Sequence, residues 1–353
     1  MMYPCQKAIV SFQKTREIGA EGKNSKVYLA HDKNIDGEVV IKEIEYRKDD
    51  ETIVDLNDFY DEARKLFKSS HPNVVQLYYA CEDDRNIYIA MPFYKNGTIK
   101  SLLAKKQLTA REVIKYAVEF LSGLHNIHSK GLIHFDIKPD NIMLSDRNEA
   151  MVSDFGLTQL VNDDGVAWVS SVYTRIIPPE FIDGYSKGDL SFDRTFDIYQ
   201  VGVSLYRMCC GDAEFYKQWD MLGSQENFIK SLKNGTFPDR EKYLPHIPDK
   251  LRKVINKCMH VDKTKRFQSA LDVINAIADI DSNLLDWEYT IGSDDIKRWK
   301  KTDKKGNLYV LEVSIDGKST AMKTTSNTSQ RVTDYCIKNI SDDDIVSFLN
   351  GID

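Results

Sequence analysis

The sequence predicts an α+β protein in which a bilobal domain is followed by a small α+β unit. Three regions of different apolar spacing support this prediction. Residues 12–94 alternate short apolar runs with glycine-bearing turns, as strands do, and contain one helical stretch. Residues 95–280 carry apolar residues at helical spacing, and residues 285–353 return to strand-like spacing. We therefore expect a β-rich lobe, a larger helical lobe and a small domain of unknown role, in that order.

Composition is typical of a globular protein. The chain has 353 residues, 42% hydrophobic and 29% charged, which is enough apolar material for sizeable cores. A formal net charge of -6 argues against a general binder of nucleic acids or membrane surfaces. No stretch approaches the roughly 18 apolar residues of a membrane span, and the six cysteines have neither zinc-site nor disulfide spacing. We expect a cytoplasmic protein without a membrane partner.

The β-rich lobe combines strands with one helix. A turn at Asp36-Gly37 separates the first two strands, and His71-Pro72 ends the helix because proline lacks the backbone N–H that a helix needs. The spacing predicts strands at 27–30, 39–42, 74–79 and 87–91 and a helix at 55–69.

The helical lobe follows the turn Lys95-Asn96-Gly97. Two short apolar pieces, 142–144 and 150–152, read as strands joined by a polar turn. The remaining apolar periodicity predicts helices at 98–105, 109–129, 193–210, 225–233, 249–259 and 268–280.

The last unit contains predicted strands at 307–313 and 320–325 around a turn, and a helix near 342–349. A basic cluster from Lys297 to Lys305 surrounds Trp299 and could bind an acidic peptide or a nucleic-acid backbone. We favour a solvated hairpin with the tryptophan on its inner face, because the same unit carries many acids. Its role is left open between a targeting, dimerising or other protein-interaction module and an autoregulatory one.

The clearest chemical signal is the motif from His134 to Asn141, followed by Asp154-Phe155-Gly156. Phosphoryl transfer needs a carboxylate that orients the attacking hydroxyl, a cation near the moving phosphate and ligands that hold Mg²⁺. Asp136, Lys138, Asn141 and Asp154 are residues of the right types for these tasks.

This motif set resembles the eukaryotic-type serine/threonine protein kinase superfamily over about residues 12–280, with His-Phe-Asp in place of the usual His-Arg-Asp. The resemblance implies the bilobal protein kinase fold and transfer of the γ-phosphoryl group of ATP, with Mg²⁺, to serine/threonine hydroxyls of a protein substrate. It also implies that Asp136 is the catalytic carboxylate, that Lys138 contacts the γ-phosphate, and that Asn141 and Asp154 bind Mg²⁺. A lysine two residues after the catalytic aspartate resembles the serine/threonine kinases rather than the tyrosine kinases.

The same resemblance implies an ATP-binding cleft. A glycine-bearing turn lets the backbone approach phosphates closely, although one extra residue separates its first two glycines and a serine replaces the third. A lysine ends the strand Val39-Val40-Ile41-Lys42 and would reach the α- and β-phosphates, paired with a glutamate ten residues before Pro72. The residues implied at this cleft are Ile18, Gly19, Gly22, Ser25, Val27, Val40, Lys42, Glu62, Met91, Pro92, Tyr94 and Met143.

Two departures from the family pattern affect regulation and substrate binding. Phe135 stands where the family keeps an arginine that pairs with a phosphate on the activation loop, so we expect activity without phosphorylation of residues 157–177. Tyr173 stands where serine/threonine kinases keep a threonine that bonds the catalytic lysine. Either Thr174 takes that role through a one-residue shift, or the contact with Lys138 is lost.

Two alternatives compete with the active protein kinase. A nucleotide-binding pseudokinase scaffold would share the fold, but such proteins often lack the lysine, the catalytic aspartate or the metal aspartate, and all three are here. A small-molecule phosphotransferase would explain the ATP residues only. It would not explain Pro178-Pro179-Glu180 together with Asp197 and with Arg266, which the resemblance pairs with that glutamate.

Overall fold

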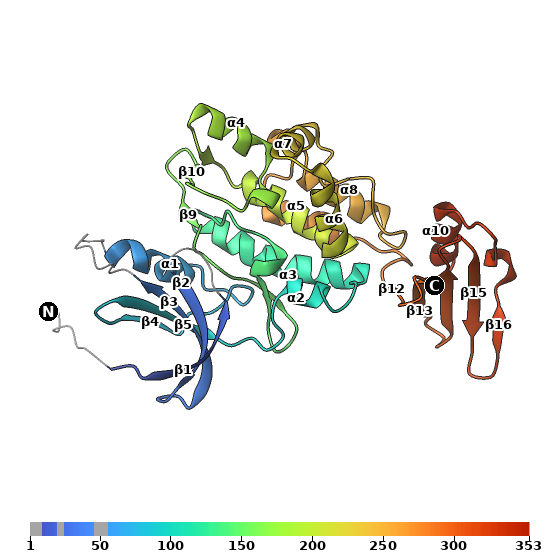
Figure 1. The fold of residues 1–353 in the computed structure, drawn as a ribbon, viewed down its shortest axis with the longest axis horizontal. Helices are drawn as coiled ribbons and strands as arrows, with labels where there is room; N and C mark the ends of the chain where they lie inside the picture. The colour runs from blue at the N-terminus through green and yellow to red at the C-terminus, as the bar shows by residue number, and fades with distance from the viewer. Residues whose placement is uncertain (1–8, 20–24, 46–55, 353) are drawn as a thin grey trace.

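The computed structural model describes residues 9–19, 25–45 and 56–352, and it has three parts (Figure 1). A β-sheet with one helix forms the N-terminal lobe, a mostly helical lobe forms the centre, and a second sheet forms the C-terminal unit at the opposite end. The predicted α+β class and bilobal arrangement are confirmed. The exact domain boundaries stay a prediction.

The N-terminal sheet is antiparallel with the strand order β1-β2-β3-β5-β4. Its elements are β1 (Phe12–Gly19), β2 (Ser25–Asp32), β3 (Gly37–Glu45), α1 (Leu56–Lys68), β4 (Tyr79–Glu82) and β5 (Asn86–Pro92). The strand predicted at 74–79 is wrong, because β4 begins only at Tyr79. Val74 and Val75 contact Val152 of the helical lobe instead, and the amide of Val75 donates to its carbonyl at 2.9 Å.

The helical lobe surrounds α5, in which nearly every residue is buried. The helices are α2 (Ile99–Leu103), α3 (Ala110–Ser129), α4 (Pro179–Lys187), α5 (Thr195–Cys210), α6 (Asp212–Leu222), α7 (Gln225–Asn234), α8 (Asp249–Cys258) and α9 (Ala270–Ala278). The six predicted helices are confirmed, whereas α4 and α6 were not predicted. Only Gly211, at a φ of 86°, separates α5 from α6. A side chain is strained at that angle, so glycine permits the sharp change of direction.

Short strands lie in the connections between these helices. They are β6 (Leu132–Ile133), β7 (Ile142–Leu144), β8 (Ala150–Val152), β9 (Gln159–Leu160), β10 (Ala167–Trp168) and β11 (Ser191–Phe192). The predicted hairpin of β7 and β8 is confirmed, and β6 pairs with β9 while β10 pairs with β11. These pairs hold the catalytic motif and the segment after Gly156 against the helical lobe.

The C-terminal unit is a five-stranded antiparallel sheet with one helix. Its elements are β12 (Glu288–Ile291), β13 (Lys297–Thr302), β14 (Leu308–Val313), β15 (Ser319–Thr324), β16 (Ser329–Arg331) and α10 (Asp342–Asn350). Trp299 lies opposite Leu311 on the inner face and is buried, as predicted. Lys301 of the basic cluster is also buried and donates to the carbonyls of Asn283 and Ile352, so it supports the fold rather than a surface site.

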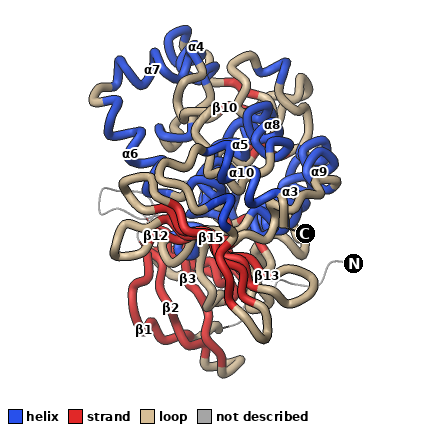
Figure 2. Tube along the Cα trace, turned by 90° about the vertical axis from the view of Figure 1, so that its right-hand side faces the viewer, coloured by secondary structure: helices blue, strands red, loops and turns tan. Residues whose placement is uncertain are grey.

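The C-terminal unit packs against the helical lobe, and Figure 2 looks onto it from the outside, with β13 and β15 in front. The indole Nε1 of Trp299 donates to Nδ1 of His246 at 3.3 Å, and Tyr289 stacks on the same imidazole with ring centroids 5.7 Å apart. Arg111 of α3 pairs with Asp286. Burial lowers the pKa of His246 to about 4, because the charged imidazolium loses its hydration there.

Candidate active site

A cavity of about 290 Å³ lies between the two lobes, and most of the predicted cleft residues line it. They are Ile18, Gly19, Val27, Val40, Lys42, Glu62, Met91, Pro92, Tyr94, Asn141, Met143 and Asp154. Ser25 lies in β2 but does not line the cavity, and Gly22 lies outside the described residues. Sequence reasoning missed Val75 and Thr98 as lining residues. Both form contacts with segments distant in sequence, Val75 with Val152 and Thr98 with Met143, and no local pattern indicates these contacts.

Lys42 forms the charged centre of this cavity. Its Nζ lies 2.9 Å from Oε1 of Glu62 and 3.3 Å from Oδ1 of Asp154. The lysine comes from β3, the glutamate from α1 and the aspartate from the loop after β8, so three elements meet at one buried cation. The neighbouring Asp61, which sequence alone could confuse with Glu62, points elsewhere and pairs with Lys65.

Asp136 lies beside this centre on the loop after β6. Its Oδ2 accepts hydrogen bonds from Nζ of Lys138 at 2.7 Å and from Nδ2 of Asn141 at 2.8 Å. Its Oδ1 is buried and accepts no hydrogen bond from the described residues. Burial raises the pKa of Asp136, and the Lys138 ammonium opposes that rise in pKa. One oxygen of this buried carboxylate is therefore left without a hydrogen bond to the described residues.

The buried helix α5 holds the catalytic loop in place. Asp197 accepts hydrogen bonds from the backbone amides of His134 and Phe135, both at 2.8 Å. Gln200, one turn later, accepts from the amide of Ile137 at 2.9 Å. Phe135 has a φ of 65°, a left-handed backbone that costs of order 1 kcal/mol for such a residue. The anchoring to α5 offsets that strain, so the loop has one defined geometry.

Apolar packing fixes the activation segment, residues 155–177. Phe135 is fully buried in an aromatic cluster that consists of Ile133, Phe135, Ala167, Val169, Phe192 and Phe196. Its ring contacts that of Phe196 edge-on, with centroids 5.1 Å apart. Ala167 and Val169 belong to the segment itself, so the Phe135 side chain packs against the segment at the position where the family has an arginine.

Arg266 binds Glu180 through two hydrogen bonds of 2.7 Å, which confirms the predicted pair.

Tyr173 contacts Lys138, but through its ring and not through its hydroxyl. The Nζ of Lys138 lies 4.7 Å from the centroid of the Tyr173 ring, so the contact is a cation–π interaction instead of a hydrogen bond to a hydroxyl. Thr174 is exposed and forms no bond to Lys138. The hydrogen bond to Lys138 is therefore absent, as in the second of the two expected outcomes, and the Tyr173 ring contacts the lysine in its place.

Comparison with known proteins identifies the family. The family model described as "Protein kinase domain" matches residues 12–276. The chain therefore belongs to the protein kinase family, which implies ATP binding, generally with Mg²⁺, and protein substrates. The Lys42–Glu62 ion pair resembles the lysine–glutamate pair of that family.

The relatives at this level of similarity are serine/threonine protein kinases. Over 183 residues the chain is 32% identical to Rho-associated protein kinase 1 of Homo sapiens, covering 51% of this chain and 13% of that protein. Over 267 residues it is 28% identical to serine/threonine-protein kinase PrkC of Bacillus subtilis, covering 74% and 39%. Over 257 residues it is 27% identical to a cAMP-dependent protein kinase catalytic subunit of Arthrobotrys oligospora, covering 72% and 46%. The matches thus cover less than half the length of each relative.

No helix within residues 9–19, 25–45 or 56–352 combines the length and the apolar character needed to cross a membrane. Within the same ranges, no three His, Cys, Asp or Glu side chains converge as a metal site.

Proposed function

We propose that this chain is an active serine/threonine protein kinase that transfers the γ-phosphoryl group of ATP to protein hydroxyls. The observation that carries the proposal is the position of the Lys42 ammonium within 3.3 Å of both Glu62 and Asp154. This arrangement joins a phosphate-binding cation to a metal-binding carboxylate in one cavity. Phosphoryl transfer depends on such positioning and charge stabilisation more than on covalent chemistry.

In this proposal Lys42 binds the α- and β-phosphates, and Glu62 holds the lysine in the required orientation. Val27 and Val40 form the roof over the adenine, while Met143 lies on the floor of the same cavity. The backbone of Pro92 and Tyr94, at the connection between the lobes, would form hydrogen bonds to the adenine edge. Ser25 and Gly22 keep their proposed places in the phosphate-covering turn.

Asp136 orients the hydroxyl that attacks the phosphate. Its free Oδ1 accepts the hydroxyl hydrogen, while Lys138 and Asn141 hold Oδ2 in place. Because Lys138 lies beside Asp136, its ammonium would also be near the phosphoryl group during transfer and would neutralise part of the charge on that group. The residues thus divide the work between orientation and charge stabilisation.

Asn141 and Asp154 fit a Mg²⁺ site. Asn141 donates its amide N–H to Asp136, which leaves its oxygen for a cation, and both Asn141 and Asp154 line the cavity. Mg²⁺ prefers one or two such protein ligands beside phosphate oxygens. When bound, it would neutralise phosphate charge during transfer.

The choice of serine/threonine rests on Lys138 and on the similarity to serine/threonine-protein kinase PrkC. The C-terminal unit keeps its proposed role as a protein-interaction or autoregulatory module. Nucleic-acid binding through the cluster from Lys297 to Lys305 is disfavoured, because Lys301 is buried there.

A transfer assay tests the proposal. The protein is incubated with labelled ATP and Mg²⁺ and a generic basic protein, beside Asp136→Asn and a control variant, Asp84→Asn, which removes an exposed carboxylate from the β4–β5 turn. We expect transfer by the wild type and the control variant only, and phosphoserine or phosphothreonine in the product. Nucleotide binding without transfer would support the pseudokinase scaffold instead, and phosphotyrosine alone would contradict the assigned hydroxyl class.

A further inference from the structure

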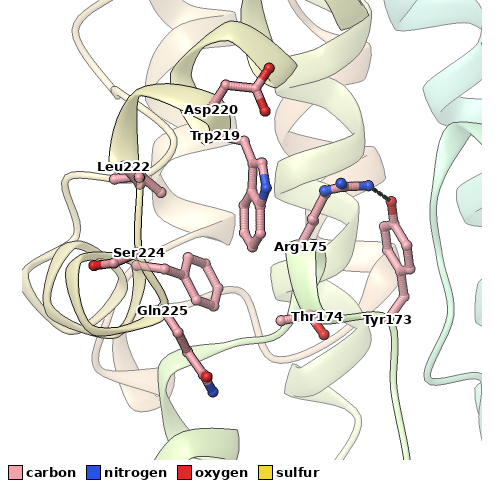
Figure 3. A pocket seen from close by; sticks show the side chains of 10 residues that line it. Tyr173, Thr174, Arg175, Trp219, Asp220, Leu222, Ser224 and Gln225 are labelled. Carbon is pink, nitrogen blue, oxygen red and sulfur yellow. Dashed lines mark hydrogen bonds between the residues drawn. The ribbon is translucent and has the colours of Figure 1, made fainter.

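A second, larger cavity of about 750 Å³ opens on the helical lobe, between the activation segment and helices α6 and α7 (Figure 3). Tyr173, Thr174 and Arg175 form one wall. The other wall consists of Trp219, Asp220, Leu222, Gly223, Ser224, Gln225 and Phe228. We call this cavity the Arg175 pocket. It lies outside the ATP cleft, and none of the roles proposed above uses it.

Aromatic rings hold the guanidinium of Arg175 in place. Its central carbon lies 5.1 Å from the ring centroid of Trp219, 5.3 Å from that of Tyr216 and 5.7 Å from that of Tyr173. Figure 3 shows the guanidinium between Trp219 and Tyr173. Its Nη1 donates to the hydroxyl of Tyr173 at 2.6 Å. A planar guanidinium stacked in this way is pre-organised, so less entropy is lost when it binds a ligand.

The charge of Arg175 is not neutralised within the described part of the chain. None of the ion pairs formed there involves Arg175, and its buried Nε has no hydrogen-bond partner. Asp220 also lines the pocket, but it is exposed and forms no ion pair with the arginine. A fixed cation without an ion-pair partner favours an anionic ligand such as a carboxylate, which forms charge-assisted hydrogen bonds with a guanidinium.

Short contacts connect this pocket to the catalytic loop. Tyr173, whose hydroxyl accepts from Arg175, also contacts Lys138 through its ring. The Nζ of Lys138 in turn lies 2.7 Å from Oδ2 of Asp136. One aromatic ring therefore separates the guanidinium from the catalytic lysine. An extended peptide advances roughly 3.3 Å per residue. A substrate with its hydroxyl at Asp136 would reach the pocket within a few residues.

We propose that the Arg175 pocket binds an acidic side chain of the protein substrate close to the phosphorylated hydroxyl, and that Arg175 determines this specificity. The inference rests on the proposed kinase function and deepens it by naming a substrate class. The occupant is an aspartate or glutamate of the substrate, because the pocket offers one fixed cation among aromatic rings. Tyr173 acts as a positioning residue between this cation and Lys138.

Matched peptides test the inference. Each contains one acceptor serine in a neutral background, with Glu, Gln or Lys placed in turn at each of four positions on either side. We expect the wild type to favour Glu over Gln at one or two positions by about tenfold in kcat/KM, mainly through KM. Arg175→Gln should abolish that ratio, and Arg175→Glu should transfer the preference to Lys. Lys187→Gln, which removes an exposed positive charge of α4 outside the pocket, should leave the ratio unchanged.

The reversal by Arg175→Glu guards against misfolding, because an unfolded enzyme cannot acquire a new preference. Equal rates for Glu and Gln peptides at every position in an active wild type would overturn the inference. A preference for Glu that remains in Arg175→Gln would also overturn it. So would phosphoryl transfer to a peptide with phosphoserine at the tested position when the peptide with Glu at that position receives no phosphoryl group.

Absence of transfer to any peptide or protein would instead contradict the proposed function. In that case, fluorescence anisotropy measures binding of the labelled Glu peptide and tests the Arg175 pocket independently of transfer. Binding by the wild type that is lost in Arg175→Gln would support the pocket, and equal binding by both would overturn it.

Discussion

The ATP cleft and the activation segment are held together by opposite means. In the cleft, Lys42 is bound between the carboxylates of Glu62 and Asp154. The activation segment is held through Phe135, which is buried among Ala167, Val169 and Phe196 at the position where the family keeps an arginine. Charges suit the cleft because its ligand is highly charged and must enter and leave. Apolar contacts suit a segment that stays ordered, because no modification is needed to complete them.

The largest effect should follow from breaking the charged side of this comparison. Lys42→Met removes the cation from the phosphate site and should lower kcat/KM by at least about 10³-fold, the scale of a lost charge that stabilises the transition state. A filter assay with labelled ATP measures the rate, and circular dichroism checks that the fold remains. Lys26→Met, on the exposed side of β2, is the matched control and should keep its activity. Wild-type rates in Lys42→Met would remove this residue from the mechanism.

Disrupting the apolar packing around Phe135 should mainly lower the stability of the fold. Phe135→Arg places a cation among apolar rings without an anion, which should lower the free energy of unfolding by about 3–5 kcal/mol. Urea unfolding monitored by tryptophan fluorescence gives the number. Phe135→Leu, which keeps an apolar side chain, should lose clearly less. If the arginine were tolerated without loss, the aromatic cluster would not be what holds the segment.

The junction with the C-terminal unit combines both kinds of contact and predicts a pH effect. The pKa of His246 is lowered to about 4 in the folded protein, whereas an unfolded histidine titrates near 6.5. The unfolded state therefore takes up the proton first as the pH falls. The stability contribution of neutral His246 is complete above about pH 6.5 and is lost progressively down to about pH 4, by about 3 kcal/mol in all.

His246→Gln keeps a hydrogen-bond acceptor for Trp299 and removes the titration. Unfolding free energies at pH 7 and pH 4.5 should then differ less in this variant than in the wild type. Other groups titrate over the same range in both proteins, so the informative quantity is the difference between the two pH dependences. Identical pH dependences would show that the buried imidazole contributes nothing.

The smallest effect is expected from the loop hydroxyls. Ser170 and Ser171 are exposed and lie in a segment that apolar contacts already order. Their joint replacement by alanine should change kcat/KM less than about twofold, because surface substitutions of this kind have small effects. A loss of activity with the fold intact would mean that phosphorylation of this loop is needed after all.

Local patterns were sufficient for elements that form independently of their surroundings. The strand ending in Lys42, the hairpin of β7 and β8 and the helix α3 follow from apolar period and turn residues. The failures are equally instructive. Val74 and Val75 resemble a strand, but they pair with the helical lobe. Lys301 reads as a surface charge, yet it is buried with its ammonium bonded to backbone carbonyls.

The sequence by itself therefore determined the fold class, the order of the lobes and the chemical types in the cleft, because these depend on periodicity and on motifs of fixed spacing. Only the tertiary structure decided that Phe135 lies within an aromatic cluster, that Tyr173 contacts Lys138 through its ring, and that Arg175 lines a pocket in which it forms no ion pair with a described residue. Each of these depends on side chains from segments far apart in the chain. No local pattern encodes which of them meet, because packing of the whole domain selects the partners.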